Sequence, residues 1–113
     1  MSIKTQRIAS NIIKELSYIL AYEVKDEDIK FVTVTDCKLA SDLSYAKIYV
    51  TVFEKEKINS TIKALNDAAG FIRKELSQRI DVRHTPELSF VYDESIEYGK
   101  KIEGIIEKIH EED

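Results

Sequence analysis

A glycine and several cations lie close together in the middle of the chain, and as a group they could bind an anion. Gly70 stands inside a stretch whose apolar residues follow a helical period. Bare glycine backbone lets a ligand approach closely, and lysine and arginine side chains hold phosphate oxygens. The candidate anion-binding residues are Lys63, Gly70, Arg73, Lys74, Arg79, Arg83 and His84, with Arg7 and Lys14 together on one face of an earlier helix.

Each group of cations also has an ordinary structural explanation. Lysine and arginine usually lie on solvated surfaces, which would account for the cations beside Gly70 and for those of the earlier helix. Three of the candidates lie near the predicted C-terminus of the helix that contains Gly70, where the helix dipole favours positive charge. They are Arg79, Arg83 and His84. The sequence alone therefore leaves phosphate binding and simple solvation open.

Other reactive side chains lack the partners that their chemistry needs. The single cysteine, Cys37, lies in a β-branched run and is expected to be an inert strand residue, and it excludes an intramolecular disulfide. His84 and His110 have no cysteine or histidine at metal-ligand spacing. The acidic run Asp26–Asp28 could hold a cation or be a solvated loop. Because no phosphate-binding loop, nucleophile elbow or supported pair of carboxylates is present, we expect no enzyme activity, no cofactor and no metal.

Length and composition indicate one soluble domain spanning residues 1–113. The chain is 43% hydrophobic and 34% charged, and its length suffices for a single core. The net charge of −4 is unevenly distributed, because residues 107–113 carry four acids and one lysine whereas residues 71–84 carry four cations and two acids. Local patches steer a polyanion more than the total does. No apolar run approaches the roughly 18 residues that span a bilayer, and no signal peptide is evident, so a cytoplasmic protein without membrane contact is expected.

Hydrophobic periodicity predicts the elements that position these residues. Helical spacing over residues 3–23 predicts an amphipathic helix. Residues 31–39 and 45–53 have strand character, and the short connection at 40–43 makes them an antiparallel hairpin. In the second strand one face is purely apolar and should lie under the helices, whereas the other is mixed. The residues of the apolar face are Ala46, Ile48, Val50 and Val52.

The second half of the chain repeats this alternation of helix and strand. One apolar stripe runs along a helical stretch from residue 58 to 80, and Pro86 precedes a third strand around residues 88–92. A last helix is predicted after that strand, with a frayed acidic tail at 107–113. Its buried stripe would consist of Tyr98, Ile102, Ile105, Ile106 and Ile109. The order is α-β-β-α-α-β-α, which predicts an α+β fold whose three-stranded sheet is covered by helices on one face.

Gly70 raises a question about the helix that contains it. On a helical projection it falls on the polar flank, and a glycine there costs about 1 kcal/mol relative to alanine. Either the helix kinks at Gly70 and turns Phe71 inward, or Phe71 is an exposed stacking residue, or the helix simply tolerates the glycine. The residues that share the polar flank with Gly70 are Lys63, Asn66, Lys74 and Ser77.

Five long stretches resemble the ribosome-binding factor A family. The similarity runs from about residue 7 to 106, and its motifs occur in the order that the family has. The stretches are Lys14-Glu-Leu-Ser-Tyr-Ile-Leu20, Phe31-Val-Thr-Val-Thr-Asp36, Asp42-Leu-Ser-Tyr-Ala-Lys-Ile-Tyr-Val50, Ala64-Leu-Asn-Asp-Ala-Ala-Gly-Phe-Ile-Arg73 and Arg83-His-Thr-Pro-Glu-Leu-Ser-Phe-Val-Tyr-Asp93.

The resemblance implies a fold and a function. It implies a type II KH-like domain in which a helical kink, here Ala68-Ala69-Gly70, replaces the Gly-x-x-Gly loop that KH domains use to clamp nucleic acid. It also implies a non-catalytic, monomeric factor that binds free 30S subunits, their precursors and 16S rRNA. Such a factor would assist late maturation, 16S rRNA processing and growth in the cold. The family's usual Asp-Pro-Arg after the first helix is replaced here by Asp26-Glu27-Asp28. The alternative function is a protein-binding adaptor that uses the KH-like scaffold without touching RNA.

Overall fold

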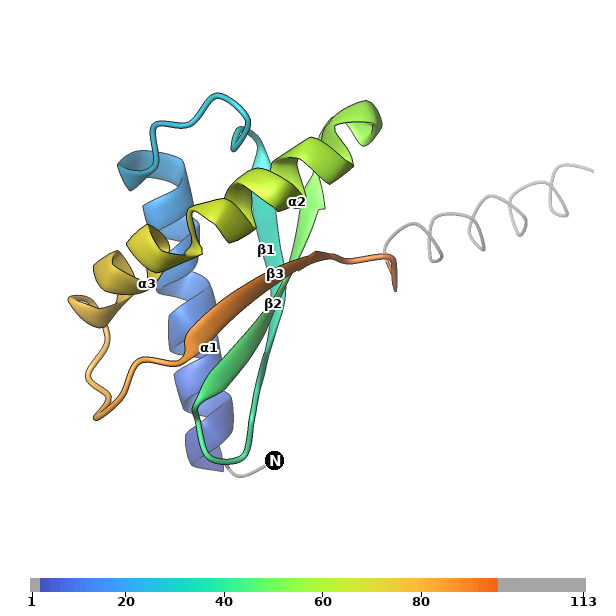
Figure 1. Cartoon of the computed structure of the whole chain (residues 1–113). Coiled ribbons are helices and arrows are strands. Elements are labelled where there is room, and N and C mark those ends of the chain that lie inside the picture. The colour runs from blue at the N-terminus through green and yellow to red at the C-terminus, as the bar shows by residue number, and fades with distance from the viewer. Residues whose placement is uncertain (1–2, 96–113) are drawn as a thin grey trace, which may run out of the picture.

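The computed structural model describes residues 3–95 and confirms the predicted order of elements in that range (Figure 1). The first helix continues through a short π-helical turn, and the hairpin, two helices and a third strand follow. The predicted last helix and the acidic tail lie outside the described residues. The elements are α1 (Ile3–Tyr18), η1 (Ile19–Glu23), β1 (Val32–Leu39), β2 (Tyr45–Val52), η2 (Lys55–Lys57), α2 (Ile58–Asp67), α3 (Ala69–Ser77) and β3 (Glu87–Tyr92).

The three strands form one sheet in the order β1-β2-β3. Strands β1 and β2 pair antiparallel, as the short connection predicted, with a bulge between Val34 and Asp36. Strand β3 pairs parallel to β2, in a register that runs from Tyr45 opposite Glu87 to Val50 opposite Tyr92. A parallel pair needs a long crossover, and α2 and α3 supply it.

The helices cover one face of this sheet, as predicted. Along β2 the apolar set is buried, whereas Tyr45 and Lys47 on the other face are exposed. Figure 1 shows α1 and α3 on the same side of the strands. The core between the two layers includes the fully buried residues Ile12, Leu16, Ile48, Leu65, Ile72 and Leu76, together with Phe90. This α+β arrangement is the predicted KH-like fold.

The long helix is interrupted at Ala68, not at Gly70. Helix α2 ends before Ala68, whose φ of −91° and ψ of 3° are not helical, and α3 begins directly after it. A negative φ of this size is open to any residue, so the interruption does not depend on glycine. Gly70 lies in the first turn of α3 and does not have a positive φ. The break thus lies at the first residue of the kink motif Ala68-Ala69-Gly70. The alternative of a kink at Gly70 that turns Phe71 inward is not observed, because Phe71 remains half exposed.

Cys37 is buried in β1, in agreement with its expected role as an inert strand residue. Burial, and then the neighbouring charge of Asp36, raise the pKa of its thiol to about 11. At neutral pH the thiol is therefore protonated and a poor nucleophile. Among residues 3–95 no helix is both long and apolar enough to cross a bilayer.

Candidate nucleic-acid interface

One open hollow gathers five of the predicted site residues. It has a volume of about 360 Å³ and lies between α3 and the loop that leads to β3. Helical spacing places its α3 residues on a single face, because positions three, four and seven apart are neighbours on a helix. The lining consists of Gly70, Arg73, Lys74 and Ser77 from α3 and Arg83, His84 and Thr85 from the loop.

Arg73 fixes the loop against α3. Its Nε and Nη2 atoms donate to the carbonyl oxygen of Thr85 at 3.1 and 2.8 Å. Nη2 also lies 3.4 Å from Nε2 of His84. Two of the five N–H donors of this guanidinium are thereby engaged within the protein. Arg73 adds positive charge to the hollow, but its main role is to hold the loop residues in place beside Lys74.

Lys74 and Arg83 are the cations of the hollow that the described residues leave without an ion pair. Both are exposed, and neither has an ion-pair partner within the described part of the chain. Gly70 beside them presents bare backbone, since a Cβ added there would meet no atom within 4 Å. The arrangement offers an anion two exposed cations and an uncovered stretch of helix backbone.

The other predicted cations do not line the hollow. Lys63 is exposed and pairs with Asp67 on α2, with Nζ 3.4 Å from the carboxylate. Arg7 and Lys14 are exposed on α1, on the side opposite the buried Ile12. Their possible part in RNA binding therefore depends on a ligand that extends beyond the hollow.

Arg79 contacts the first helix and its π-helical extension. Its guanidinium lies 3.6 Å from the carboxylate of Glu15 and 3.2 Å from that of Glu23, and 4.4 Å from the ring centroid of Tyr18. Its side chain is only 29% exposed. These contacts tie the segment that follows α3 to α1 and η1, so the first role of Arg79 is structural.

The polar residues Ser77 and Thr85 also line the hollow, although the cation pattern did not select them. Ser77 lies on the predicted polar flank, which was the available signal, whereas Thr85 enters only because Arg73 holds its carbonyl oxygen. Asn66, placed on the same flank by the sequence, is instead engaged with β3. No cluster of three or more potential metal ligands occurs in residues 3–95.

A sequence model of ribosome-binding factor A matches residues 4–106. The chain belongs to the ribosome-binding factor A family. The ribosome-binding factor A of Staphylococcus epidermidis is 45% identical over 113 residues, which cover 99% of this chain and 97% of that protein. The Staphylococcus carnosus protein of the same name is 47% identical over 111 residues, with 97% and 96% covered.

Solved structures of ribosome-binding factor A share the fold. The crystal structure from Thermus thermophilus has a TM-score of 0.68 at 26% identity and covers 78% of this chain and 94% of that one. The solution structure of a putative ribosome binding factor A from Thermotoga maritima has a TM-score of 0.70 at 28% identity, with 80% and 88% covered. A homology model of the T. thermophilus factor was fitted into a cryo-EM map of its complex with 30S. It is 21% identical to this chain with a TM-score of 0.61, and it covers 84% of this chain and 97% of that one. At this identity it supports the fold alone.

The substitution Gly70→Ala separates the effect of this glycine on stability from its effect on binding. We expect the free energy of unfolding to rise by about 0.5–1 kcal/mol, because alanine favours the helix and its methyl group meets open space. Affinity for 30S particles should fall severalfold, because the methyl group covers the backbone that a ligand would approach. Urea unfolding and sedimentation with 30S particles measure the two quantities. Gln6→Ala at an exposed position of α1 is the control, expected to raise stability slightly and leave affinity unchanged. Lower stability or unchanged affinity for Gly70→Ala would contradict this role.

Proposed function

We propose that this chain is a non-catalytic assembly factor that binds free 30S subunits and their precursors through 16S rRNA. It would act as a cytoplasmic monomer, assist late maturation and 16S rRNA processing, and support growth in the cold. The observation that carries the proposal is the hollow in which the bare backbone of Gly70 adjoins Lys74 and Arg83, which have no ion-pair partner among residues 3–95. Membership of the ribosome-binding factor A family indicates the ribosomal subunit as the source of the RNA.

The chemistry of the hollow suits a phosphate backbone better than a base. Lysine and arginine bond phosphate oxygens without reading sequence. Helix α3 contributes both exposed backbone and the cation Lys74, and the loop contributes Arg83 from the other side. Few cations are present, so selectivity for 30S would come from the shape of folded rRNA. The exposed Lys63, Arg7 and Lys14 would add phosphate contacts at the periphery, and His84 and Arg79 would add less.

Salt dependence tests whether phosphates are bound. Each phosphate that a cation neutralises releases counterions, so the logarithm of the binding constant falls by about 0.7–0.9 per contact for each tenfold rise in salt. Two or three contacts in the hollow alone should lower 30S affinity at least roughly tenfold between 50 and 200 mM KCl at constant Mg²⁺, and contacts by the peripheral cations would steepen the fall. Sedimentation with salt-washed 30S particles measures this, and 50S particles provide the control. A flat response would favour the protein-binding adaptor, and absence of 30S binding would reject the proposal.

A further inference from the structure

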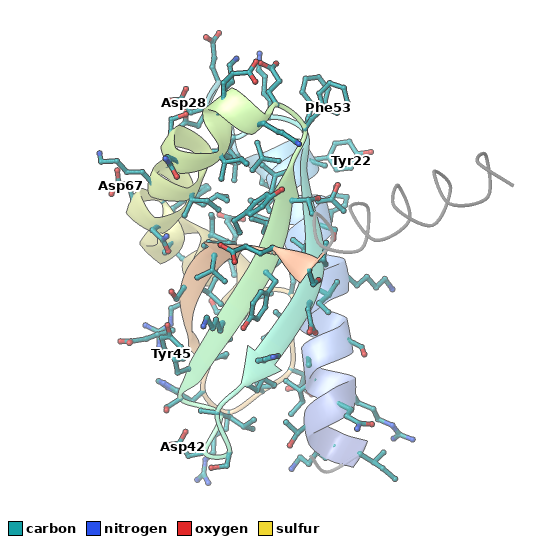
Figure 2. The ribbon with its side chains drawn as sticks, turned by 90° about the vertical axis from the view of Figure 1, so that its right-hand side faces the viewer. Tyr22, Asp28, Asp42, Tyr45, Phe53 and Asp67 are labelled. Atoms are coloured by element: carbon teal, nitrogen blue, oxygen red, sulfur yellow. The ribbon has the colours of Figure 1, made fainter. Side chains whose placement is uncertain are left out.

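Two large aromatic side chains are exposed together at one end of the molecule, and a third is exposed toward the same end. Phe31 and Phe53, which flank the ends of β1 and β2, are 74% and 80% exposed, and their ring centroids lie 6.0 Å apart. Tyr22 of η1 is 70% exposed. Figure 2 shows Tyr22, Phe53 and Asp28 at this end and Tyr45 at the opposite end. Soluble proteins seldom leave such a group uncovered unless it binds something. We call the surface formed by Phe31 and Phe53 the aromatic end.

Phe31 is held in an unfavourable backbone conformation. Its φ is 56°, in the left-handed region that bulky residues avoid. This conformation explains why β1 begins one residue later than predicted. The amide of Phe53 donates to the carbonyl oxygen of Phe31 at 3.3 Å, which fixes the two residues side by side. The contacts within the described residues leave most of the Phe31 ring uncovered, so the strain is not explained by core packing.

An apolar hollow adjoins the aromatic end. It has a volume of about 510 Å³, and Phe31 forms part of its wall. A smaller hollow of about 50 Å³ lies on the other side of Phe31, toward Phe53. A large aliphatic or aromatic side chain from a partner could enter the larger hollow while its neighbours contact the two rings. The apolar residues of the larger hollow are Leu20, Ala21, Val24, Ile29, Phe31 and Val32.

The charge around the aromatic end is negative. Between residues 23 and 30 four carboxylates stand against two lysines. Glu23 is neutralised by Arg79, whereas Asp26, Glu27 and Asp28 have no ion-pair partner within residues 3–95. The carboxylate of Asp26 instead accepts the amide of Asp28 at 2.9 Å. With Glu23 neutralised, three carboxylates stand against Lys25 and Lys30, so this segment keeps a net charge of about −1, opposite in sign to the hollow around Gly70.

We propose that the aromatic end docks a cationic protein segment that carries an aliphatic or aromatic anchor. The anchor would fill the hollow beside Phe31, and the segment's lysines and arginines would lie over the rings and the acidic run. Building on the proposed function, the source of the segment is a ribosomal protein of the small subunit. The chain would then hold rRNA at the Gly70 hollow and a protein at the aromatic end.

Site-specific cross-linking tests the occupant. Phe53→p-benzoylphenylalanine, irradiated on 30S particles, should yield an adduct that survives ribonuclease, is digested by protease, and maps to a lysine- and arginine-rich segment of one ribosomal protein. Tyr45→p-benzoylphenylalanine is the control, because Tyr45 is an exposed aromatic at the other end of the sheet (Figure 2). An adduct at position 53 with rRNA, with residues 96–113 of the same chain or with a second copy would overturn the proposal. Equal cross-linking from both positions to the same protein would also overturn it.

A paired substitution separates protein docking from RNA binding. Phe31→Asn with Phe53→Ser removes both rings from exposed positions, and asparagine tolerates a left-handed φ. We expect about tenfold weaker binding to 30S particles and unchanged binding to protein-free 16S rRNA. No loss, or equal loss on both, would refute protein docking. If the unaltered chain fails to bind 30S, the proposed function fails by itself. The docking proposal is then judged with total protein extracted from 30S particles, where an adduct at position 53 with a cationic segment supports it and no adduct overturns it.

Discussion

Reversing the charges of Lys74 and Arg83 together should weaken binding to 30S particles at least about a hundredfold. A hydrogen bond to a charged group contributes about 1.5–3 kcal/mol, and 1.4 kcal/mol is a factor of ten in affinity, so two lost phosphate contacts multiply to that effect. The Lys74→Glu, Arg83→Glu variant should keep its free energy of unfolding within about 0.5 kcal/mol, because both side chains are exposed and unpaired among the described residues. Arg73 is unsuited to this test, since its replacement would release the loop at Thr85.

Sedimentation at several salt concentrations measures this effect and identifies its cause. Removing two phosphate contacts should reduce the salt slope by about two. Lys38→Glu with Lys47→Glu is the matched control, because it changes net charge equally on the open face of the sheet. These lysines pair across β1 and β2, and both lie over the ring of Tyr49. If both double variants lose affinity equally, the effect reflects total charge and the contact surface lies elsewhere.

The elements were predictable because their signal is local. The alternation along β2 fixes which side chains face the helices, and the structure buries Ala46, Ile48 and Val50 accordingly. An apolar period of two residues marks one face of a strand, and a period of 3.6 residues marks one face of a helix. Each pattern therefore predicts which face of its element is buried. That Gly70, Arg73 and Lys74 lie together was predictable for the same reason, since all three lie within five residues of one helix.

The roles of individual polar residues were not predictable, because they depend on partners far along the chain. Arg79 and Lys74 are both cations of the same region, yet only Arg79 meets carboxylates from the first helix, 64 and 56 residues away. The exact position of the break, at Ala68 and not at Gly70, was not predictable for a related reason. Glycine marks a position where the backbone is free to deviate, but the deviation occurs where the packing of two helices on one sheet requires it.

Asn66 shows this limit most clearly. The sequence places it on the polar flank with Lys63 and Gly70, where a solvated amide is expected. In the structure its Oδ1 accepts the amide of Phe90 at 2.9 Å, and its Nδ2 donates to the carbonyl oxygen of Phe90 at 2.9 Å. The side chain therefore bonds β3, an edge strand of the sheet, as a neighbouring strand would. This contact fixes α2 to β3 two residues before the helix breaks.

We expect Asn66→Ala to lower the free energy of unfolding by about 2–4 kcal/mol. The substitution removes both bonds and leaves the main-chain N–H and C=O of Phe90, a residue only 1% exposed, without these partners. Leaving a partly buried donor or acceptor unsatisfied costs about 1–3 kcal/mol each, and the better helix propensity of alanine offsets only a fraction of this. Urea unfolding measures the loss, and hydrogen exchange at the Phe90 amide shows whether it arises at β3.

Asn59→Ala is the matched control for this prediction, because Asn59 is an exposed asparagine of the same helix. It should change stability by no more than about 0.5 kcal/mol, since surface substitutions rarely do more. A difference between the two variants isolates the bonds to Phe90 from the general effect of replacing asparagine in a helix. If Asn66→Ala costs less than about 1 kcal/mol and the Phe90 amide keeps its protection, the packing of Leu65 and Ile72 alone holds α2 and α3 on the sheet, and the side-chain pairing is incidental.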